Sequence, residues 1–213
     1  MYYNRVADQG ISNLYQYSEP YLKDKRVLDL GCGVGCYLEK FSTDSMGFDA
    51  SFENIKRAKE KGLDVTFGDL NLGLDIPEKS FDVIFCSHVL EHVDSPISLL
   101  RECNRVLKED GLIFVSVPNE TNIPNVIKLD HYFSNHSEHI YSFSPNNLKV
   151  LIKKAGFVTE KLFIDLYLMR KFFDKSPKLA LHVLNLIQQM PLILSLPFSE
   201  EFMLMAKKVN QII

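Results

Sequence analysis

The chain has 213 residues, a length that suits one domain with a complete hydrophobic core. Hydrophobic residues make up 46% of it and charged residues 24%, a balance typical of globular proteins. The formal net charge of -3 argues against nucleic acid as the main partner, because binding to phosphates requires a basic surface.

Four cysteines without a dense framework favour reduced thiols in a cytoplasmic protein. Cys32 and Cys36 have a spacing that a metal pair can have, but no second pair with ligand spacing exists, so we expect no zinc there. Segment 1–10 lacks the apolar centre of a signal peptide, and polar residues and prolines interrupt the apolar stretch 179–198. We therefore expect no transmembrane segment, while peripheral contact with a membrane stays open.

Short β-rich runs alternate with helical segments in the first half, which predicts a parallel sheet with crossover helices. We expect strands at residues 26–30, 45–48, 64–67, 81–87, 111–117, 158–164 and 201–207. Helices are expected to begin near Tyr37, Phe52, Pro96 and Pro145. Residues 1–24 predict an N-terminal helical flap, and residues 165–199, bounded and interrupted by prolines, predict a helical insertion or lid.

The strongest local signal is the run Val27-Leu-Asp-Leu-Gly-Cys-Gly-Val-Gly35, in which a predicted strand leads into alternate glycines. Glycines permit a sharp turn and let a ligand approach the backbone closely. The spacing G-x-G-x-G differs from the G-x-G-x-x-G of dinucleotide sites. Asp29 would repel a pyrophosphate but attract the ammonium of a ligand with an amino-acid end. The alternatives are a tight loop without a ligand and a nicotinamide site.

Two further acids follow predicted strands. Asp49 ends the second strand, where an acid can accept hydrogen bonds from ribose hydroxyls. Its alternative role is the N-cap of the next helix, which suits Ser51 better. Asp69 follows the third strand, where its carboxylate could accept a hydrogen bond from an adenine amino group while Leu70 packs on the ring. A simple turn is a fair alternative at that place.

Five motifs together carry a resemblance, and they occur in the order VLDLGCGVG, FDAS, GDL, FDVIFCSHVLEHV and RVLKEDGLIFVSVPN. With EHIYSFS and AGF further on, they resemble the class I S-adenosylmethionine-dependent methyltransferases, small-molecule branch, which includes ubiquinone-biosynthesis O-methyltransferases. The match covers residues 27–157. It implies a Rossmann-like three-layer α/β sandwich, with a seven-stranded, mostly parallel sheet whose last strand is antiparallel.

The resemblance implies S-adenosylmethionine as the cofactor. We expect it to lie against ten residues near the ends of the first four strands: Asp29, Gly31, Cys32, Gly33, Gly35, Asp49, Ala50, Asp69, Leu70 and Ser87. Tyr2, Tyr3, Tyr15 and Tyr17 either cover the cofactor from the N-terminal flap or pack against the sheet.

Three histidines are candidate catalytic residues, because imidazole titrates near neutral pH and methyl transfer to a hydroxyl needs a base. His88 and His92 follow the fourth strand, and His139 lies in a later loop with His131 and His136. The alternative is that these residues brace ordered loops.

Some of the ubiquinone O-methyltransferases use glutamate and histidine for a divalent metal at the place that corresponds to His88, Glu91 and His92. His88 stands where an acid is expected, so we expect no metal. The H-x-x-E-H spacing also occurs in zinc peptidases, but here it follows a strand in a methyltransferase-like frame.

These observations predict an enzyme that moves a methyl group from S-adenosylmethionine to a small-molecule acceptor, at an oxygen in preference to nitrogen or carbon. The alternative is a non-catalytic S-adenosylmethionine-binding regulatory module. The apolar insertion could pack internally, dimerise, cover the acceptor or touch a membrane, so a monomer and a homodimer both stay open.

Overall fold

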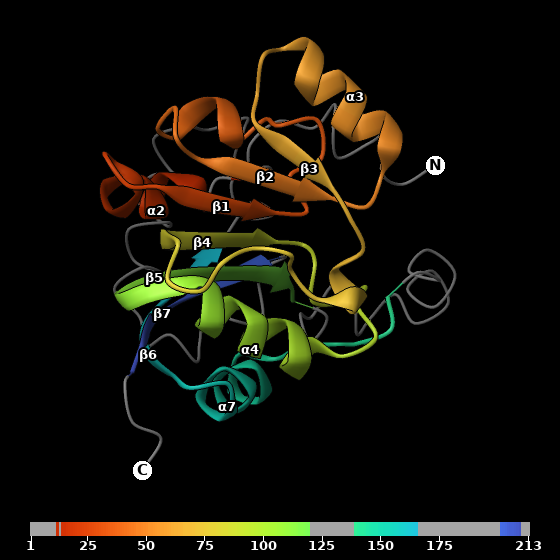
Figure 1. Ribbon diagram of the computed structural model, residues 1–213. Coiled ribbons are helices and arrows are strands. Elements are labelled where there is room, and N and C mark those ends of the chain that lie inside the picture. The colour runs from red at the N-terminus through yellow and green to blue at the C-terminus, as the bar shows by residue number, and fades with distance from the viewer. Residues whose placement is uncertain (1–11, 13, 120–138, 166–200, 210–213) are drawn as a thin grey trace, which may run out of the picture.

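Seven strands and their connecting helices account for most of the described part of the chain. The computed structural model describes residues 12, 14–119, 139–165 and 201–209 (Figure 1). The predicted insertion 165–199 therefore lies almost wholly outside the described residues. So do Tyr2, Tyr3, His131 and His136.

The elements follow the chain order that the alternating pattern predicts. The strands are β1 (Val27–Leu30), β2 (Met46–Asp49), β3 (Val65–Phe67), β4 (Phe81–Ser87), β5 (Leu107–Pro118), β6 (Phe157–Asp165) and β7 (Glu201–Lys208). The α-helices are α2 (Tyr15–Leu22), α3 (Phe52–Glu60), α4 (Pro96–Val106) and α7 (Pro145–Lys154), and η1 (Leu38–Lys40) and η2 (Leu70–Leu72) are single 3-10 turns.

The strands form one sheet in the order β3-β2-β1-β4-β5-β7-β6. Strands β1 to β5 pair in parallel, and β7 is antiparallel to both of its neighbours, β5 and β6. This confirms the predicted Rossmann-like sandwich with a seven-stranded sheet and an antiparallel last strand. Because β7 lies between β5 and β6, the last strand made is an interior strand.

Alternate residues of each central strand face opposite sides of the sheet, as the strand period requires. In β4, Val83 and Phe85 pack with α2, whereas Ile84 and Cys86 belong to the larger cluster that includes α4 and α7. All four side chains are buried, which explains why this strand is apolar without alternation. Figure 1 shows α4 and α7 together on one side of the sheet, with α2 and α3 on the other.

Two helices begin at serine caps, of which the sequence indicates the first. The side chain of Ser51 accepts a hydrogen bond from the backbone of Asn54, which confirms it as the N-cap of α3. Ser144 and Asn147 form a reciprocal capping box at the start of α7. Both caps place the preceding residues, including Asp49 in the first case, outside the helix.

The predicted helix near Tyr37 is wrong, since only the 3-10 turn η1 forms there. Gly33 and Gly35 have positive φ angles of 55° and 84°, which delay any helix. After η1, the backbone of Phe41 is already extended, and a turn at Ser42 leads into β2. Too few residues remain between these two constraints for an α-helix.

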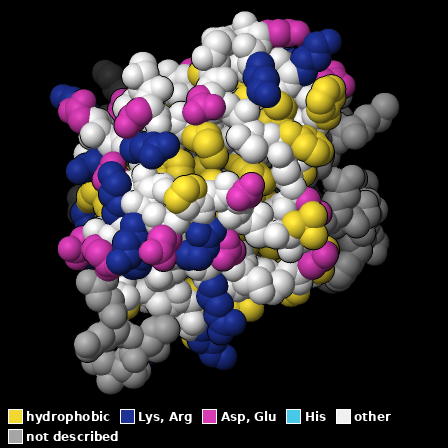
Figure 2. Space-filling model, in the orientation of Figure 1, with side chains coloured by type: hydrophobic (Ala, Val, Ile, Leu, Met, Phe, Trp, Pro, Cys, Tyr) yellow, Lys and Arg dark blue, Asp and Glu magenta, His cyan; other side chains and the backbone are white. Residues whose placement is uncertain are grey.

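The structure also shows some properties of the surface and the thiols. All four cysteines are unpaired, as their spacing predicts. Within the described ranges, no helix is long and apolar enough to span a bilayer. Figure 2 shows acidic and basic side chains intermixed on one face of the molecule, without a broad area of positive charge on that face.

Candidate active site

The candidate site lies at the edge of the sheet where the parallel strands end. Asp49 and Ser87 are the last residues of β2 and β4, and the glycine run follows β1 directly. Strand β7 runs in the opposite direction, so its first residue, Glu201, pairs with Pro118 near the end of β5. The edge thus collects side chains from both halves of the chain, as in other open α/β sheets.

The loop after β1 is held by backbone hydrogen bonds to β2. The N–H groups of Gly31 and Cys32 donate to the carbonyl of Phe48 at 2.7 and 3.1 Å. Gly31, Gly33 and Gly35 all have positive φ angles, and a Cβ on Gly33 would meet no other atom within 4 Å. A side chain at Gly33 would therefore point into open space, so it is the positive φ angle that favours glycine there.

Besides its backbone N–H, Cys32 contributes its thiol to this loop, which donates to the carbonyl of Gly33 at 3.6 Å. Its side chain is buried in a small cluster that includes Leu38, Ile55 and Val65, on the inner side of the loop. Burial raises the pKa of its thiol, with the nearby carboxylates of Asp29 and Asp49 acting in the same direction. A buried thiol of this kind is a packing group, not a nucleophile.

Asp29 is 1% exposed, and its Oδ2 atom is buried without a hydrogen-bond partner among the described residues. Burial, and secondly the charge of Asp49, raise the pKa of this carboxyl well above its ordinary value. An unpartnered buried carboxylate is costly to the free protein, which points to a cationic or donating ligand group beside it.

Asp49 connects the glycine loop to the start of α3. Its Oδ2 accepts from the backbone N–H of Gly33 at 2.9 Å, and its Oδ1 accepts from that of Ser51 at 2.7 Å. As the sequence predicts, Asp49 is not the helix cap. It stabilises the glycine loop instead, by accepting from Gly33. The Asn54 side-chain amide also donates to Oδ1 at 3.3 Å, so Oδ2 is the oxygen that keeps a second lone pair for a hydroxyl donor.

The remaining predicted cofactor residues lie around this loop. Asp69 is exposed and caps η2 through Asn71, so the turn is observed there, and Leu70 packs partly against the main core. Ala50 is exposed beside Asp49. Ser87 bonds through its side chain to the Tyr37 hydroxyl, and burial raises the pKa of Tyr37 to about 12.

The glycine loop and the segment after β4 are in direct contact. A Cβ added to Gly31 would lie 2.5 Å from a methyl carbon of Val89, so that position tolerates only hydrogen. Val89 lies between His88 and Leu90, directly after β4. Whatever the loop binds is therefore next to the segment that carries the predicted catalytic histidines.

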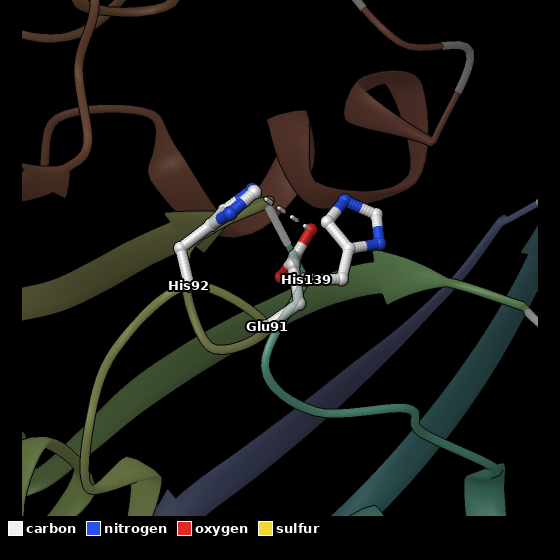
Figure 3. A group of neighbouring side chains, drawn as sticks. All are labelled: Glu91, His92 and His139. Atoms are coloured by element: carbon white, nitrogen blue, oxygen red, sulfur yellow. Dashed lines mark ion pairs between the residues drawn. The ribbon is translucent and has the colours of Figure 1, made fainter. Parts of the chain in front are cut away.

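Three polar side chains converge on this segment: Glu91, His92 and His139 (Figure 3). One ligand atom from each lies within 4.8 Å of those of the other two. The rings of His92 and His139 meet edge to face, with centroids 4.8 Å apart. Glu91 is 1% exposed; its Oε1 lies 3.3 Å from His88 Nδ1, and its Oε2 has no hydrogen-bond partner among the described residues.

His139 is held there by the backbone that follows it. The N–H groups of Ile140 and Tyr141 donate to the carbonyl of Glu91 at 2.8 and 3.3 Å. The Tyr141 hydroxyl donates to the carbonyl of Asp94 at 2.8 Å. These bonds join a segment that comes after β5 to the turn that comes after β4.

His88 faces a different pair of groups from His92. Its Nδ1 lies 3.3 Å from Glu91 Oε1 and its Nε2 lies 3.3 Å from Glu201 Oε1. Burial lowers the pKa of His88, but Glu201 and Glu91 outweigh it, so the pKa stands well above its ordinary value. Glu201 also bonds to the hydroxyls of Ser116 and Ser12.

Of the three predicted catalytic histidines, the structure thus brings His92 and His139 together and gives His88 a bracing position between two acids. The sequence interpretation missed Glu201. Its signal was available, because the first residue of an antiparallel last strand must lie where the parallel strands end. From the sequence, Glu91 is a candidate only as a residue that stabilises the loop or as the counterpart of a metal ligand in relatives. Nothing in the neighbouring sequence distinguishes a buried acid in a turn from an exposed one.

Comparison with known proteins assigns the family. A model of the methyltransferase domain matches residues 3–162. The chain belongs to the methyltransferase domain family. Its ubiquinone-biosynthesis relative from Actinobacillus pleuropneumoniae serotype 7, an O-methyltransferase, is 34% identical over 110 residues, which are 46% of this chain and 47% of the relative. The methyltransferase described here therefore spans about half the length of the curated relatives that it matches.

Solved structures agree with this assignment. A SAM-dependent methyltransferase from Archaeoglobus fulgidus is 25% identical with a TM-score of 0.67, over 92% of this chain and 91% of that one. An S-adenosylmethionine-dependent methyltransferase from Mesorhizobium loti shares the fold, with 17% identity, a TM-score of 0.67, and coverage of 92% and 98%. The chain thus has the domain and the fold of S-adenosylmethionine-dependent methyltransferases, which favours that cofactor over the nicotinamide alternative.

Proposed function

We propose that this methyltransferase transfers the methyl group of S-adenosylmethionine to an oxygen atom of a small acceptor in the cytoplasm. The observation that carries the proposal is the contact between Gly31 and Val89, which joins the predicted cofactor loop to the histidine segment. The similarity to O-methyltransferases over part of the chain supports oxygen as the acceptor atom.

The residues at the strand ends fit the cofactor chemically. The unpartnered carboxylate oxygen of Asp29 suits the ammonium of the methionine part, and the open space beside Gly33 leaves room for its carbon chain. The spare lone pair on Asp49 Oδ2 suits a ribose hydroxyl. Asp69 and Leu70 would border the adenine, with Ala50 on the opposite side, and Ser87 would line the methionine end.

The histidines then act on the acceptor. S-adenosylmethionine supplies an activated methyl group, so the protein's main task is to align an acceptor oxygen and exclude water. His92 or His139 would accept the proton of an acceptor hydroxyl as the new carbon–oxygen bond forms. Their convergence at the segment that contacts the glycine loop supports this role. His88 would position Glu91 without touching the acceptor.

Calorimetric titration with S-adenosylhomocysteine tests the cofactor site. Wild type should bind at micromolar concentrations, and Asp49→Ala should bind at least about tenfold more weakly, the effect of losing about 1.4 kcal/mol. Asp75→Ala, at an exposed acid outside the site, serves as the matched control. Equal binding by wild type and Asp49→Ala would contradict the assignment.

Methylation of a panel of small phenols, catechols, amines and carboxylic acids tests the acceptor class. With methyl-deuterated S-adenosylmethionine, mass spectrometry should find the label on oxygen. His92→Gln and His139→Gln should lower the turnover number more than they change the affinity for S-adenosylhomocysteine. Labelled products only on nitrogen or carbon would rule out the proposed acceptor, while cofactor binding without any product would favour a regulatory module.

A further inference from the structure

The backbone of Asp94, in the turn that carries His92, joins two segments that lie far apart in the sequence. Its N–H donates to the side-chain oxygen of Asn71 at 2.8 Å, and its carbonyl accepts from the hydroxyl of Tyr141 at 2.8 Å. Asn71 belongs to η2, and Tyr141 follows His139 by two residues. One residue therefore holds both the turn proposed to border the adenine and the segment that carries His139.

The turn at η2 is anchored on both sides of Asn71. The side chain of Asp69 accepts from the backbone N–H of Asn71 at 2.9 Å. Further along the chain, the guanidinium of Arg105 on α4 donates to the carbonyls of Leu74 and Ile76 at 2.9 and 2.8 Å. Because Asp69 and Asn71 are parts of one short turn, a ligand that engages Asp69 would also restrict the side chain of Asn71.

The segment after His139 depends on the turn after β4 for its position. The N–H groups of Ile140 and Tyr141 donate to the carbonyl of Glu91, next to the bond between the Tyr141 hydroxyl and Asp94. Both side-chain bonds at Asp94 are exposed, so water competes for them. Solvent-exposed bonds of this kind open locally at low cost, and a ligand that restricts one partner strengthens them.

We propose that Asn71 and Tyr141 are positioning residues, which couple occupancy of the cofactor site to the position of His139 through the backbone of Asp94. The inference rests on the proposed function, because it takes Asp69 as a cofactor residue and His139 as a base. A cofactor that fixes η2 would strengthen the bond between Asn71 and Asp94, and with it the hold of Tyr141 on the histidine segment. By linkage, the same bonds would favour cofactor binding.

Hydrogen exchange measures this coupling without any acceptor. Exchange of the backbone amides of Ile140 and Tyr141 is followed by NMR on the whole chain, with and without saturating S-adenosylhomocysteine. In wild type the ligand should slow exchange at both amides, and in Asn71→Ala and Tyr141→Phe it should not. Calorimetry should show that each substitution weakens S-adenosylhomocysteine binding by roughly two- to tenfold, the effect of losing one hydrogen bond.

A double variant separates coupling from two unrelated losses. Asn71→Ala and Tyr141→Phe break the same chain of bonds, so the double variant should bind S-adenosylhomocysteine as well as the weaker single variant does. Independent structural effects would add. Two matched controls should behave like wild type: Asn146→Ala, at an exposed amide of α7, and Tyr21→Phe, which loses a hydroxyl that bonds to Lys161.

The outcomes distinguish this inference from the proposed function. Unchanged exchange at Ile140 and Tyr141 in ligand-bound wild type overturns the inference, as do normal slowing in Asn71→Ala and additive losses in the double variant. In each of these cases the ligand still binds, and the proposed function stands. A wild-type protein that does not bind S-adenosylhomocysteine overturns both.

Discussion

The Oδ2 atom of Asp49, at the end of β2, accepts a hydrogen bond of 2.9 Å from the backbone N–H of Gly33, in the loop after β1. Two adjacent strand ends are thereby joined through one carboxylate. The acid that is proposed to hold a ribose also sets the shape of the loop that is proposed to hold the methionine part. Substitutions at different glycines of this loop should therefore differ in whether they mainly lower the stability of the fold or the affinity for the cofactor.

The first prediction compares two glycines of that loop. Gly33→Ala keeps its neighbours but places a methyl group in the open space beside Gly33 at a positive φ, which costs about 1–2 kcal/mol. Gly35→Ala adds a clash with Leu63 to the same strain. Urea unfolding should therefore show the larger loss of stability for Gly35→Ala. Calorimetry should show the larger loss of S-adenosylhomocysteine affinity for Gly33→Ala, and the reverse order would refute the proposed position of the ligand beside Gly33.

The second prediction concerns Asp29, whose pKa burial raises in the folded state. Ionisation then costs more in the folded chain than in the unfolded one, so this group makes the free protein less stable as pH rises from the unfolded pKa, near 3.8, to the folded one. Asp29→Asn removes that cost. We expect the thermal midpoint to rise by about 2–4 °C at pH 8, the shift of about 1 kcal/mol, and by less at pH 5.

Cofactor affinity should move in the opposite direction for this variant. The amide that replaces the carboxylate in Asp29→Asn lacks the charge that attracts an ammonium, so S-adenosylhomocysteine should bind at least about tenfold more weakly, the equivalent of about 1.4 kcal/mol. Asp75→Asn, at an exposed acid, is the matched control for both measurements. A variant that is less stable and binds normally would show that Asp29 is a structural residue.

The third prediction concerns Glu201. His88 and the hydroxyls of Ser116 and Ser12 lower the pKa of Glu201 in spite of its burial. A depressed folded pKa gives stability that is present above the unfolded pKa, near 4.5, and is lost as pH falls through the folded value. The unfolding free energy of wild type should exceed that of Glu201→Gln at pH 6, and the difference should shrink below about pH 4. Parallel pH profiles for the two proteins would contradict the ion pair.

The fourth prediction decides between a flap and a packed helix for α2. Tyr15 is 8% exposed and belongs to a cluster with Val27, Phe85 and Phe114 on the sheet. If the ring is part of the core, Tyr15→Ala should lose about 3–5 kcal/mol in urea unfolding, while Tyr15→Phe should lose little. Near-normal stability of Tyr15→Ala, with weaker cofactor binding, would support a movable flap instead.

Local patterns were sufficient for most of the sheet and for part of the site. Three features depend only on residues close in sequence and could therefore be predicted: the apolar run of β4, the glycine spacing after β1 and the cap at Ser51. The turn at η1 was not predictable in the same way, since its length depends on where β2 must begin. The hydrophobic pattern of the few residues between Gly35 and Phe41 does not show where β2 begins.

The polar network was the part that sequence could not provide. Glu91, His139 and Glu201 lie far apart in the chain, and their contacts depend on the register of β7 against β5 and on bonds from Ile140 to Glu91. His88 and His92 are only four residues apart, and the sequence alone does not distinguish them as candidate bases. The left-handed backbone at His88 turns it toward Glu201, whereas His92 faces His139.

The position of β7 between β5 and β6 has a consequence for how the protein is made. Because β6 is joined to the sheet through β7, a chain that lacks residues 201–208 would leave the edge of β5 unpaired and β6 without its partner strand. Exposed edges of this kind invite pairing with other chains. A message truncated before residue 201 would thus yield a product prone to aggregate and lacking the partner of His88, and synthesis of the final strand would close the sheet and complete the active centre in one event.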